Sequence, residues 1–270
     1  MKKQIIKKWY NALNFPAEYD SAFISYLESS KLDGISCIED YNPERHTAED
    51  NLLAYLYFCE EVSKKYERLG IPDTVLYDTL SDIVTWTKVY YGIYGKVGLA
   101  EIAWLKNHVS FLLFKLGRLQ FKMASSEFDI PEVNINRGES VMEIHIPEGD
   151  AMTPEKCQAS IVAANEFFPK YFPSFKWDYF TCHSWLLDEG LCEILSPSSN
   201  ILAFQRMFTK TDSHLEKSDA IIRYTFRWDA KRETLDSYPA KSSFAERVKA
   251  KAKSGGEFFE ALGYIKHSQS

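Results

Sequence analysis

The spacing of hydrophobic residues changes along this chain of 270 residues, from helical in its first part to strand-like in its second. Apolar residues recur every three or four positions from Ile5 to Leu13 and from Leu52 to Val62, which predicts amphipathic helices. Further helices are expected over residues 17–28, from residue 73 to the glycines after residue 91, and over 99–110. From Leu119 onward apolar residues alternate, which is typical of strands.

Two helix boundaries can be placed from single residues. Thr47 is the expected N-cap of the helix that runs to about Leu69, and Asp50 stands three residues further on, as in a capping box. Gly70 is the expected end of that helix. The run from residue 111 to 118 is compatible with either helix or strand.

The region from Ser140 to Phe208 predicts a crossover unit. A strand over 140–146 is followed by a turn at 147–150, a helix that begins at Thr153 and a second strand over 176–185. A short helical turn over 186–195 and a third strand over 201–209 are expected next. A strand, a helix and a strand in this order favour parallel strands in one sheet, and such folds bind ligands at the end of the strands.

The remaining pattern completes an α+β protein. Residues 220–228 are expected to form another strand, residues 242–253 a basic helix that stops at Gly255, and residues 258–265 a last short strand. The change of periodicity near residue 115 predicts a helical N-terminal domain over 1–114, followed by a mixed α/β sheet domain over 115–270.

Composition narrows the function classes. The formal net charge is -6 and the hydrophobic fraction 45%, so the chain has neither the basic bias of a nucleic-acid binder nor the composition of a disordered one. The N-terminus is basic at first, but Lys7 and Lys8 interrupt the apolar run that a signal peptide would need, and no apolar run is long enough to span a bilayer. We therefore expect a cytoplasmic protein with a small-molecule substrate and without nucleic-acid or membrane partners; the sequence leaves its oligomeric state open.

The five cysteines show no CxxC spacing and have apolar neighbours. Their number is odd, which favours reduced thiols, and no metal site is expected. They are Cys37, Cys59, Cys157, Cys182 and Cys192.

Several motifs carry a family resemblance. They are the runs FKLGRLQF (114–121), IHIPEG (144–149), CHSWLLD (182–188) and SNI with FQRMF (199–208), followed by Gly255-Gly256 and the LGY at 262–264. Together they resemble acyltransferase-like bacterial proteins with a GNAT-like C-terminal domain. The resemblance covers most of the chain and is strongest from residue 104 to 208.

The resemblance implies a GNAT-like C-terminal domain and a cofactor that is acetyl-CoA or another acyl-CoA. In that fold the pantetheine arm lies between two splayed parallel strands, here 141–146 and 179–184, which makes Ile144 and Ile146 candidate binding residues. The pyrophosphate would lie on the turn that opens the next helix, with Gly149, Thr153 and Lys156 as candidates.

That turn also has a second interpretation. A helix N-terminus offers free N–H groups and partial positive charge, and Pro154 strengthens the start signal. Yet Glu148, Asp150 and Glu155 surround the single glycine, whereas the usual GNAT turn is basic and glycine-rich. These carboxylates would stabilise the helix end or repel a phosphate by about 1 kcal/mol each.

Two groups of residues are candidates for catalysis. Glu143 and His145 alternate with apolar residues, so they share one face of their strand. Either residue could act as a general base, or the two could be a solvent-facing or cross-strand pair. On the other strand Cys182 and Ser184 share a face, and His183 lies on the opposite one. Cys182 is either a buried inert thiol or a nucleophile paired with His145 across the sheet, and His183 is either a core histidine or catalytic.

Three functions remain open on the sequence. We expect acyl transfer from an acyl-CoA to an amine-type acceptor by direct attack, with Glu143 or His145 as the base. The alternatives are a non-catalytic GNAT-like protein that binds another small ligand or a protein partner in the same cleft, and a cysteine hydrolase that uses Cys182. Whether the chain is catalytically active depends on the acidic turn.

Overall fold

The computed structural model describes residues 1–267, and the chain divides into two compact units, 1–116 and 117–270. The expected boundary lay after residue 114. The observed division falls at the turn between the first two strands, and each unit is described by itself below.

The first unit is helical up to a short strand at its end. Its α-helices are α1 (Lys2–Ala12), α2 (Asp20–Ser29), α3 (Ala48–Leu69), α4 (Asp73–Leu80), α5 (Asp82–Tyr94) and α6 (Ile102–Val109). The capping box is present: Thr47 accepts a hydrogen bond from the N–H of Asp50, and the Asp50 carboxylate accepts one from the N–H of Thr47. Gly70 ends α3 with φ of 65°. The expected helix from residue 73 is two helices, because the helix is interrupted at Ser81.

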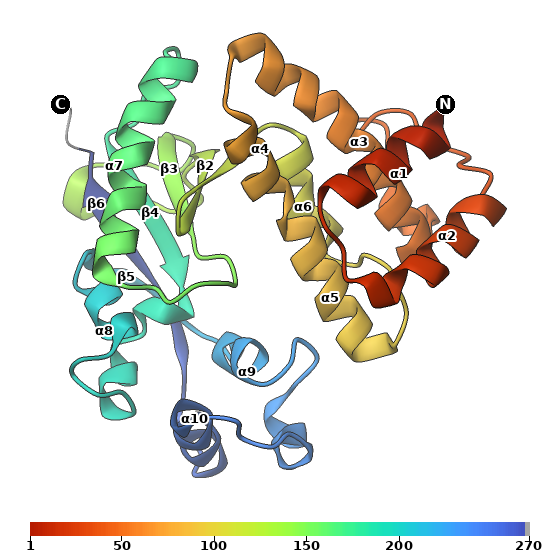
Figure 1. The fold of residues 1–270 in the computed structure, drawn as a ribbon. Coiled ribbons are helices and arrows are strands. Elements are labelled where there is room, and N and C mark those ends of the chain that lie inside the picture. Colours follow the sequence, from red (N-terminus) through yellow and green to blue (C-terminus); the bar gives the residue numbers. More distant parts are fainter. Residues whose placement is uncertain (268–270) are drawn as a thin grey trace. The chain divides into compact units, whose positions relative to one another are not determined.

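The sheet supplies the frame of the second unit (Figure 1). The second unit supplies the strands β2 (Leu119–Ser125), β3 (Ser140–His145), β4 (Tyr179–Ser184), β5 (Thr209–Lys217) and β6 (Phe259–Lys266), and the short strand at the end of the first unit is β1 (Leu113–Leu116). Their order is β1-β2-β3-β4-β6-β5. β3 and β4 are parallel, whereas β2–β3, β4–β6 and β5–β6 are antiparallel. The predicted crossover is therefore present, with α7 (Pro154–Tyr171) between its two parallel strands.

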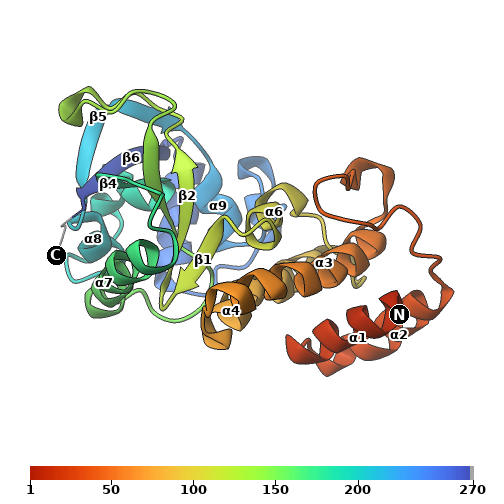
Figure 2. The same cartoon turned by 90° about the horizontal axis from the view of Figure 1, so that it is seen from above.

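Helix α7 lies along one face of this sheet (Figures 1 and 2). The strand residues that face it are apolar and buried: Met142, Ile144, Phe180 and Cys182 are each at most 2% exposed. Phe168 of α7 reaches this layer, since its ring centroid lies 6.4 Å from that of Phe121. The strands therefore bury alternate residues against α7 and turn the others to the opposite face.

Two predicted strands are helices instead. Residues 201–209 were expected to be the third strand, but Asn200–Gln205 forms α8, and Ser199 caps it by accepting from the N–H of Ile201. Residues 220–228 contain α9 (Ala220–Thr225), in which Ile221 and Ile222 are both buried. Burial of adjacent residues suits a helix in a core and not a strand with one solvent face, so the apparent alternation of Ile222, Tyr224 and Phe226 is misleading.

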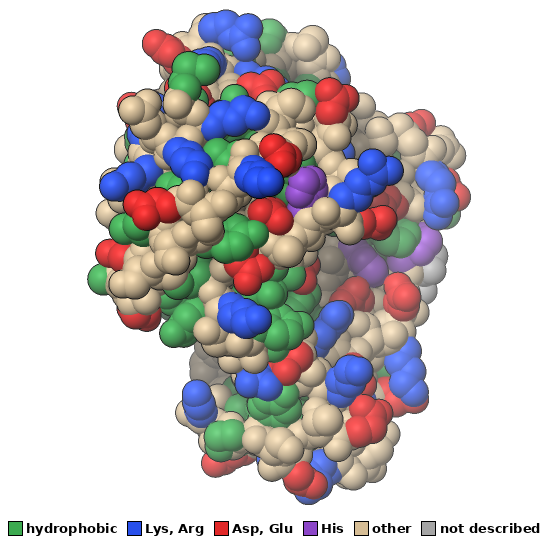
Figure 3. Space-filling view, turned by 90° about the vertical axis from the view of Figure 1, so that its right-hand side faces the viewer, with side chains coloured by type: hydrophobic (Ala, Val, Ile, Leu, Met, Phe, Trp, Pro, Cys, Tyr) green, Lys and Arg blue, Asp and Glu red, His purple; other side chains and the backbone are tan. Residues whose placement is uncertain are grey.

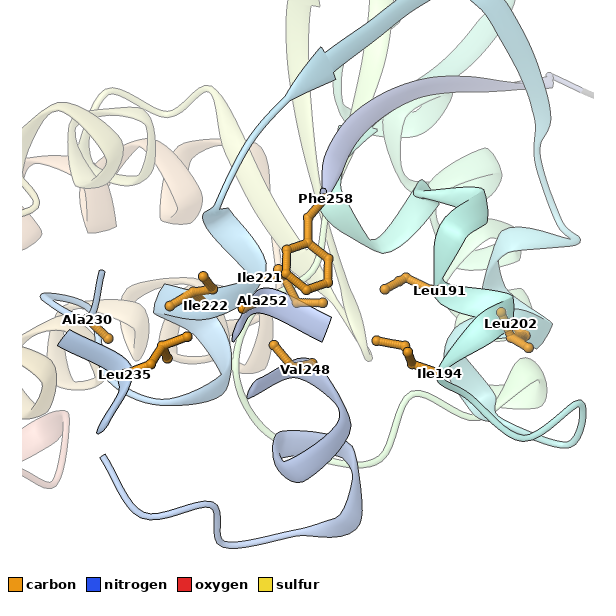
Figure 4. Packing of buried hydrophobic residues seen from close by; sticks show 10 residues of the cluster. All are labelled: Leu191, Ile194, Leu202, Ile221, Ile222, Ala230, Leu235, Val248, Ala252 and Phe258. Carbon is orange, nitrogen blue, oxygen red and sulfur yellow. The ribbon is translucent and has the colours of Figure 1, made fainter. Parts of the chain in front are cut away.

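These short helices pack with α10 (Ser243–Lys253) around a second, smaller core, which is drawn in Figure 4. Phe258, at the entry to β6, points into it beside Leu191 and Ile221, and Val248 approaches from α10. The cluster forms where the chain has left β4 and before it returns as β6. It fixes the segment that follows the C-terminal end of β4.

Candidate active site

The two parallel strands β3 and β4 are paired at only two positions. Met142 lies opposite Phe180, and Glu143 lies opposite Thr181. Beyond these positions, Ile144 and His145 remain paired with β2, while Cys182, His183 and Ser184 remain paired with β6. The strands therefore separate towards their C-terminal ends. Backbone N–H and C=O groups along such a gap are available to a ligand, because buried backbone groups need partners.

The register decides which side chains share a face. Residues directly opposite one another in a sheet point the same way, so Glu143 and His145 are on the same face as Thr181 and His183. Cys182 is on the other face, beneath α7. The possible pair of Cys182 with His145 is therefore wrong.

A carboxylate joins a histidine and a lysine on the β3 side of the gap. The Glu143 carboxylate lies 3.2 Å from Nε2 of His145 and accepts a hydrogen bond of 2.9 Å from Nζ of Lys122 on β2. Burial alone would raise the pKa of Glu143, but the hydrogen bonds to His145 and Lys122 hold it below its usual range. Glu143 is thus ionised at neutral pH and oriented by both neighbours.

A second histidine and carboxylate occupy the β4 side. Nδ1 of His183 lies 4.0 Å from the carboxylate of Glu260 on β6, and that carboxylate also accepts a hydrogen bond from Ser218. The side chains of His183 and His145 are 24% and 31% exposed, so both imidazoles are open to solvent in part. The gap is thus flanked by two histidines, each close to a carboxylate.

The segment between β2 and β3 passes over the same face. Its Phe128 ring lies 4.9 Å from the ring of His183 and 4.8 Å from that of His214, measured between centroids. Ile130 and Ile135 are buried against Val141 and Leu262. This segment therefore covers one side of His183 with an aromatic ring.

Cys182 has the properties of an inert thiol. It is 1% exposed, and burial raises its pKa to about 12. A thiol nucleophile needs thiolate character and access to substrate, and Cys182 has neither. All five cysteines are free.

The acidic turn is held together by charges within it. Asp150 forms an ion pair of 2.7 Å with Lys156, and both side chains are largely exposed. Thr153 caps α7, as predicted, by accepting from the N–H of Lys156. Hydrogen bonds from the Glu155 N–H and from Thr153 lower the pKa of Glu155. Two of the three carboxylates therefore have partners at the helix end.

The sequence did not indicate Arg118, which spans this turn. Its guanidinium donates to the carbonyl oxygens of Pro147 and Asp150, at 2.8 and 2.7 Å. Gly149 between them has φ of 141°, a conformation that essentially only glycine adopts. Lys122, Glu260 and Phe128 were missed as well. Only Lys122 left a signal, as the polar position between two apolar residues of a strand.

Two hollows lie outside this region. One of about 280 Å³ in the helical unit is lined in part by Phe23, Tyr26 and Tyr91. Another of about 340 Å³ is lined in part by Thr225 and Tyr238. On the face drawn in Figure 3, basic side chains are interspersed with acidic ones. In the part of the chain that the structure describes, none of the helices has the length and apolarity needed to cross a bilayer.

The fold is α+β, and its sheet opens between the two parallel strands β3 and β4. Comparison with family profiles matches residues 113–265 to the GNAT-like C-terminal domain and residues 24–111 to the N-acyltransferase N-terminal domain. The chain therefore belongs to the family with a GNAT-like C-terminal domain, and the resemblance seen in the sequence is confirmed.

Solved structures show the same fold. The crystal structure of an acyltransferase in complex with decanoyl-CoA and teicoplanin has a TM-score of 0.81 and 24% identity, over 97% of this chain and 87% of that one. An acyltransferase mutant in complex with octanoyl-CoA has the same TM-score and identity, over 98% and 88% of the two chains. No curated protein matches the chain.

Proposed function

We propose that this protein transfers an acyl group from an acyl-CoA to an amine-type acceptor by direct attack. The observation that carries the proposal is the separation of β3 and β4 after Glu143 and Thr181, with His145 and His183 on one face of the separating ends. The similar solved acyltransferases are complexes with octanoyl-CoA and decanoyl-CoA, which supports an acyl-CoA as donor.

The donor fits the gap by its chemistry. Amide groups of a pantetheine arm can hydrogen-bond to strand backbone that lacks a neighbouring strand, here around Ile144, Ile146 and Cys182. The turn at 147–153, with Gly149, Thr153 and Lys156, would hold the pyrophosphate. Its N–H groups and the N-terminus of α7 favour an anion, although Glu148 and Asp150 weaken that preference.

The polar face supplies the groups for the reaction. The acceptor amine attacks the thioester carbonyl carbon, the C–S bond breaks, and CoA leaves as a thiol or thiolate. An imidazole, His145 or His183, takes the proton from the amine, and its carboxylate neighbour, Glu143 or Glu260, stabilises the imidazolium that forms. Backbone N–H groups of the 144–149 region would polarise the carbonyl oxygen.

The test is an assay of acyl transfer to an amine with acetyl-CoA, octanoyl-CoA and decanoyl-CoA as donors. The release of free CoA thiol measures the rate. Replacing the base by glutamine should lower kcat by about 10²- to 10⁴-fold while acyl-CoA affinity changes little. His145→Gln and His183→Gln, singly and together, identify which imidazole acts. If kcat stayed at the wild-type value in both single variants and in the double variant, the proposal would be contradicted.

Binding of acyl-CoA without transfer to any amine would favour the alternative, a non-catalytic protein with a ligand in the same cleft. Isothermal titration with the three donors makes that distinction before any acceptor is known. Absence of heat and of a thermal shift with all three would contradict both the donor and the transfer.

A further inference from the structure

Arg118 is tied to α7 by its backbone before its side chain reaches the turn. Its N–H donates to Oγ of Ser160 on α7 at 2.8 Å, and Ser160 is 1% exposed. The preceding residue, Gly117, has φ of 73°, and a Cβ there would lie 3.0 Å from the same Oγ. The turn between β1 and β2 is thus seated on α7, which fixes where the Arg118 side chain begins.

The side chain then donates hydrogen bonds to two carbonyl groups of the turn. Nη1 donates to the Pro147 carbonyl at 2.8 Å and Nε donates to the Asp150 carbonyl at 2.7 Å. Burial lowers the pKa of Arg118, yet a guanidinium stays charged in proteins. A planar fork that binds two carbonyls fixes the orientation of two peptide groups at once.

Fixing those carbonyls also fixes the N–H groups behind them. In a trans peptide the C=O and the following N–H point in opposite directions, and the described chain contains only trans peptides. The N–H groups of Glu148 and Ala151 therefore point away from Arg118. Within residues 1–267 neither of them has a hydrogen-bond acceptor. Gly149 between them has nothing within 4 Å of a Cβ position, which leaves room for a ligand.

We propose that Arg118 is a positioning residue that presents the N–H groups of Glu148 and Ala151 to the pyrophosphate of the acyl donor. Backbone N–H groups that converge on one side of a turn form an anion-binding concavity. Arg118 does not touch the phosphates in this arrangement. It offsets the acidic side chains of the turn by geometry, because the donors stand ready without an entropic cost on binding. The inference rests on the proposed function, since it assigns a role within the same donor site.

The test compares two ligands that differ in the pyrophosphate. CoA and pantetheine share the thiol arm, but pantetheine lacks the phosphates and the nucleoside. Binding of each is measured by calorimetry on the full chain, for the wild type and for Arg118→Lys and Arg118→Met. The lysine keeps the charge but offers no fork to two carbonyls.

Both variants should weaken CoA binding by roughly tenfold or more, in line with the loss of hydrogen bonds to a charged group, and leave pantetheine binding within about twofold. Arg247→Met is the matched control, because Arg247 also donates to a backbone carbonyl, that of Ser243, but on the surface of α10. It should change neither affinity.

Wild-type affinity for CoA that survives intact in Arg118→Lys would overturn the inference, since charge alone would then suffice. Equal weakening of both ligands would overturn it too, because it would indicate general damage to the fold; circular dichroism of each variant checks this directly. A wild type that binds neither ligand contradicts the proposed function itself, and the role of Arg118 falls with it.

Discussion

Glu143 on β3 lies opposite Thr181 on β4, and this is the last position at which the two parallel strands are paired. The pair marks the start of the gap, and Glu143 is also the residue that joins Lys122 and His145. One side chain therefore stands both at the structural branch point and at the centre of the charged group beside it.

Replacing Glu143 by glutamine should destabilise the protein in a pH-dependent way. The pKa of Glu143 is held below its usual range, so its contribution is present above the ordinary carboxyl pKa of about 4.3 and is lost as pH falls through the lower folded value. We expect Glu143→Gln to lower the free energy of unfolding by about 1–3 kcal/mol at pH 7. The deficit should shrink towards zero below about pH 4. Urea titrations at pH 7 and below about pH 4 measure this difference in the free energy of unfolding.

Glu216→Gln is the control for that experiment, because Glu216 is exposed at the end of β5. It should leave the free energy of unfolding unchanged at both pH values. A deficit for Glu143→Gln that persisted at low pH would mean that packing, and not charge, accounts for it.

Cys182 should react slowly with alkylating reagents. Burial raises its pKa to about 12, so the thiolate is scarce at neutral pH, and the sulfur is shielded as well. Iodoacetamide at pH 7.5 should label the exposed Cys192 at least about 100-fold faster than Cys182, as followed by mass spectrometry of peptides. Rapid, selective labelling of Cys182 would restore the cysteine hydrolase as a candidate.

Gly149→Ala should disturb the turn at 147–153, which is the proposed pyrophosphate site. With φ of 141°, the turn places Gly149 where an L-residue is strained, and we expect a loss of about 1–3 kcal/mol of stability, measured by thermal unfolding. CoA affinity should fall with it. Gly92→Ala is the matched control: Gly92 is in α5, has open space around it, and should gain about 0.5–1 kcal/mol. Equal behaviour of the two variants would contradict the role of the turn.

Ser160→Ala should remove the contact between α7 and the β1–β2 turn, which carries Arg118. The Ser160 hydroxyl accepts from the N–H of Arg118 and donates to the Lys156 carbonyl, and both bonds would be lost in a buried place. We expect a cost of about 1–3 kcal/mol in chemical denaturation. Ser196→Ala, on an exposed loop, should be neutral. An unchanged free energy of unfolding for Ser160→Ala would show that this contact does not hold the β1–β2 turn on α7.

The sequence predicted the crossover unit well because its signals are local. Thr153 and Pro154 start α7, and alternation in β3 placed Glu143 and His145 on one face, as observed. The same alternation misled at 201–209 and 220–228, where two short helices are buried in a separate core with α10. Each of these helices has only six residues, less than two turns, and so short a segment cannot show whether its apolar residues follow a helical or a strand period.

The candidate site was predictable only in part for a related reason. Glu143, His145 and His183 were found from their own strands. Arg118 lies in the turn between β1 and β2 and Glu260 lies on β6, both remote in sequence from the groups they approach, and no local pattern indicates these contacts. Register between strands also settled what a single strand could not, namely that Cys182 and His145 face opposite ways.

The ring of Phe128 leaves His183 accessible from fewer directions. Phe128 belongs to the 126–139 segment, which connects β2 and β3 but contributes no strand of its own to the six-stranded sheet, so under the proposed function this segment lines one side of the approach to His183. Exchange of that connection would reshape the approach while the separating strands stayed as they are. If the proposed acyl transfer holds, proteins that share this scaffold can therefore diverge in the nucleophile they admit without altering how they bind the acyl donor.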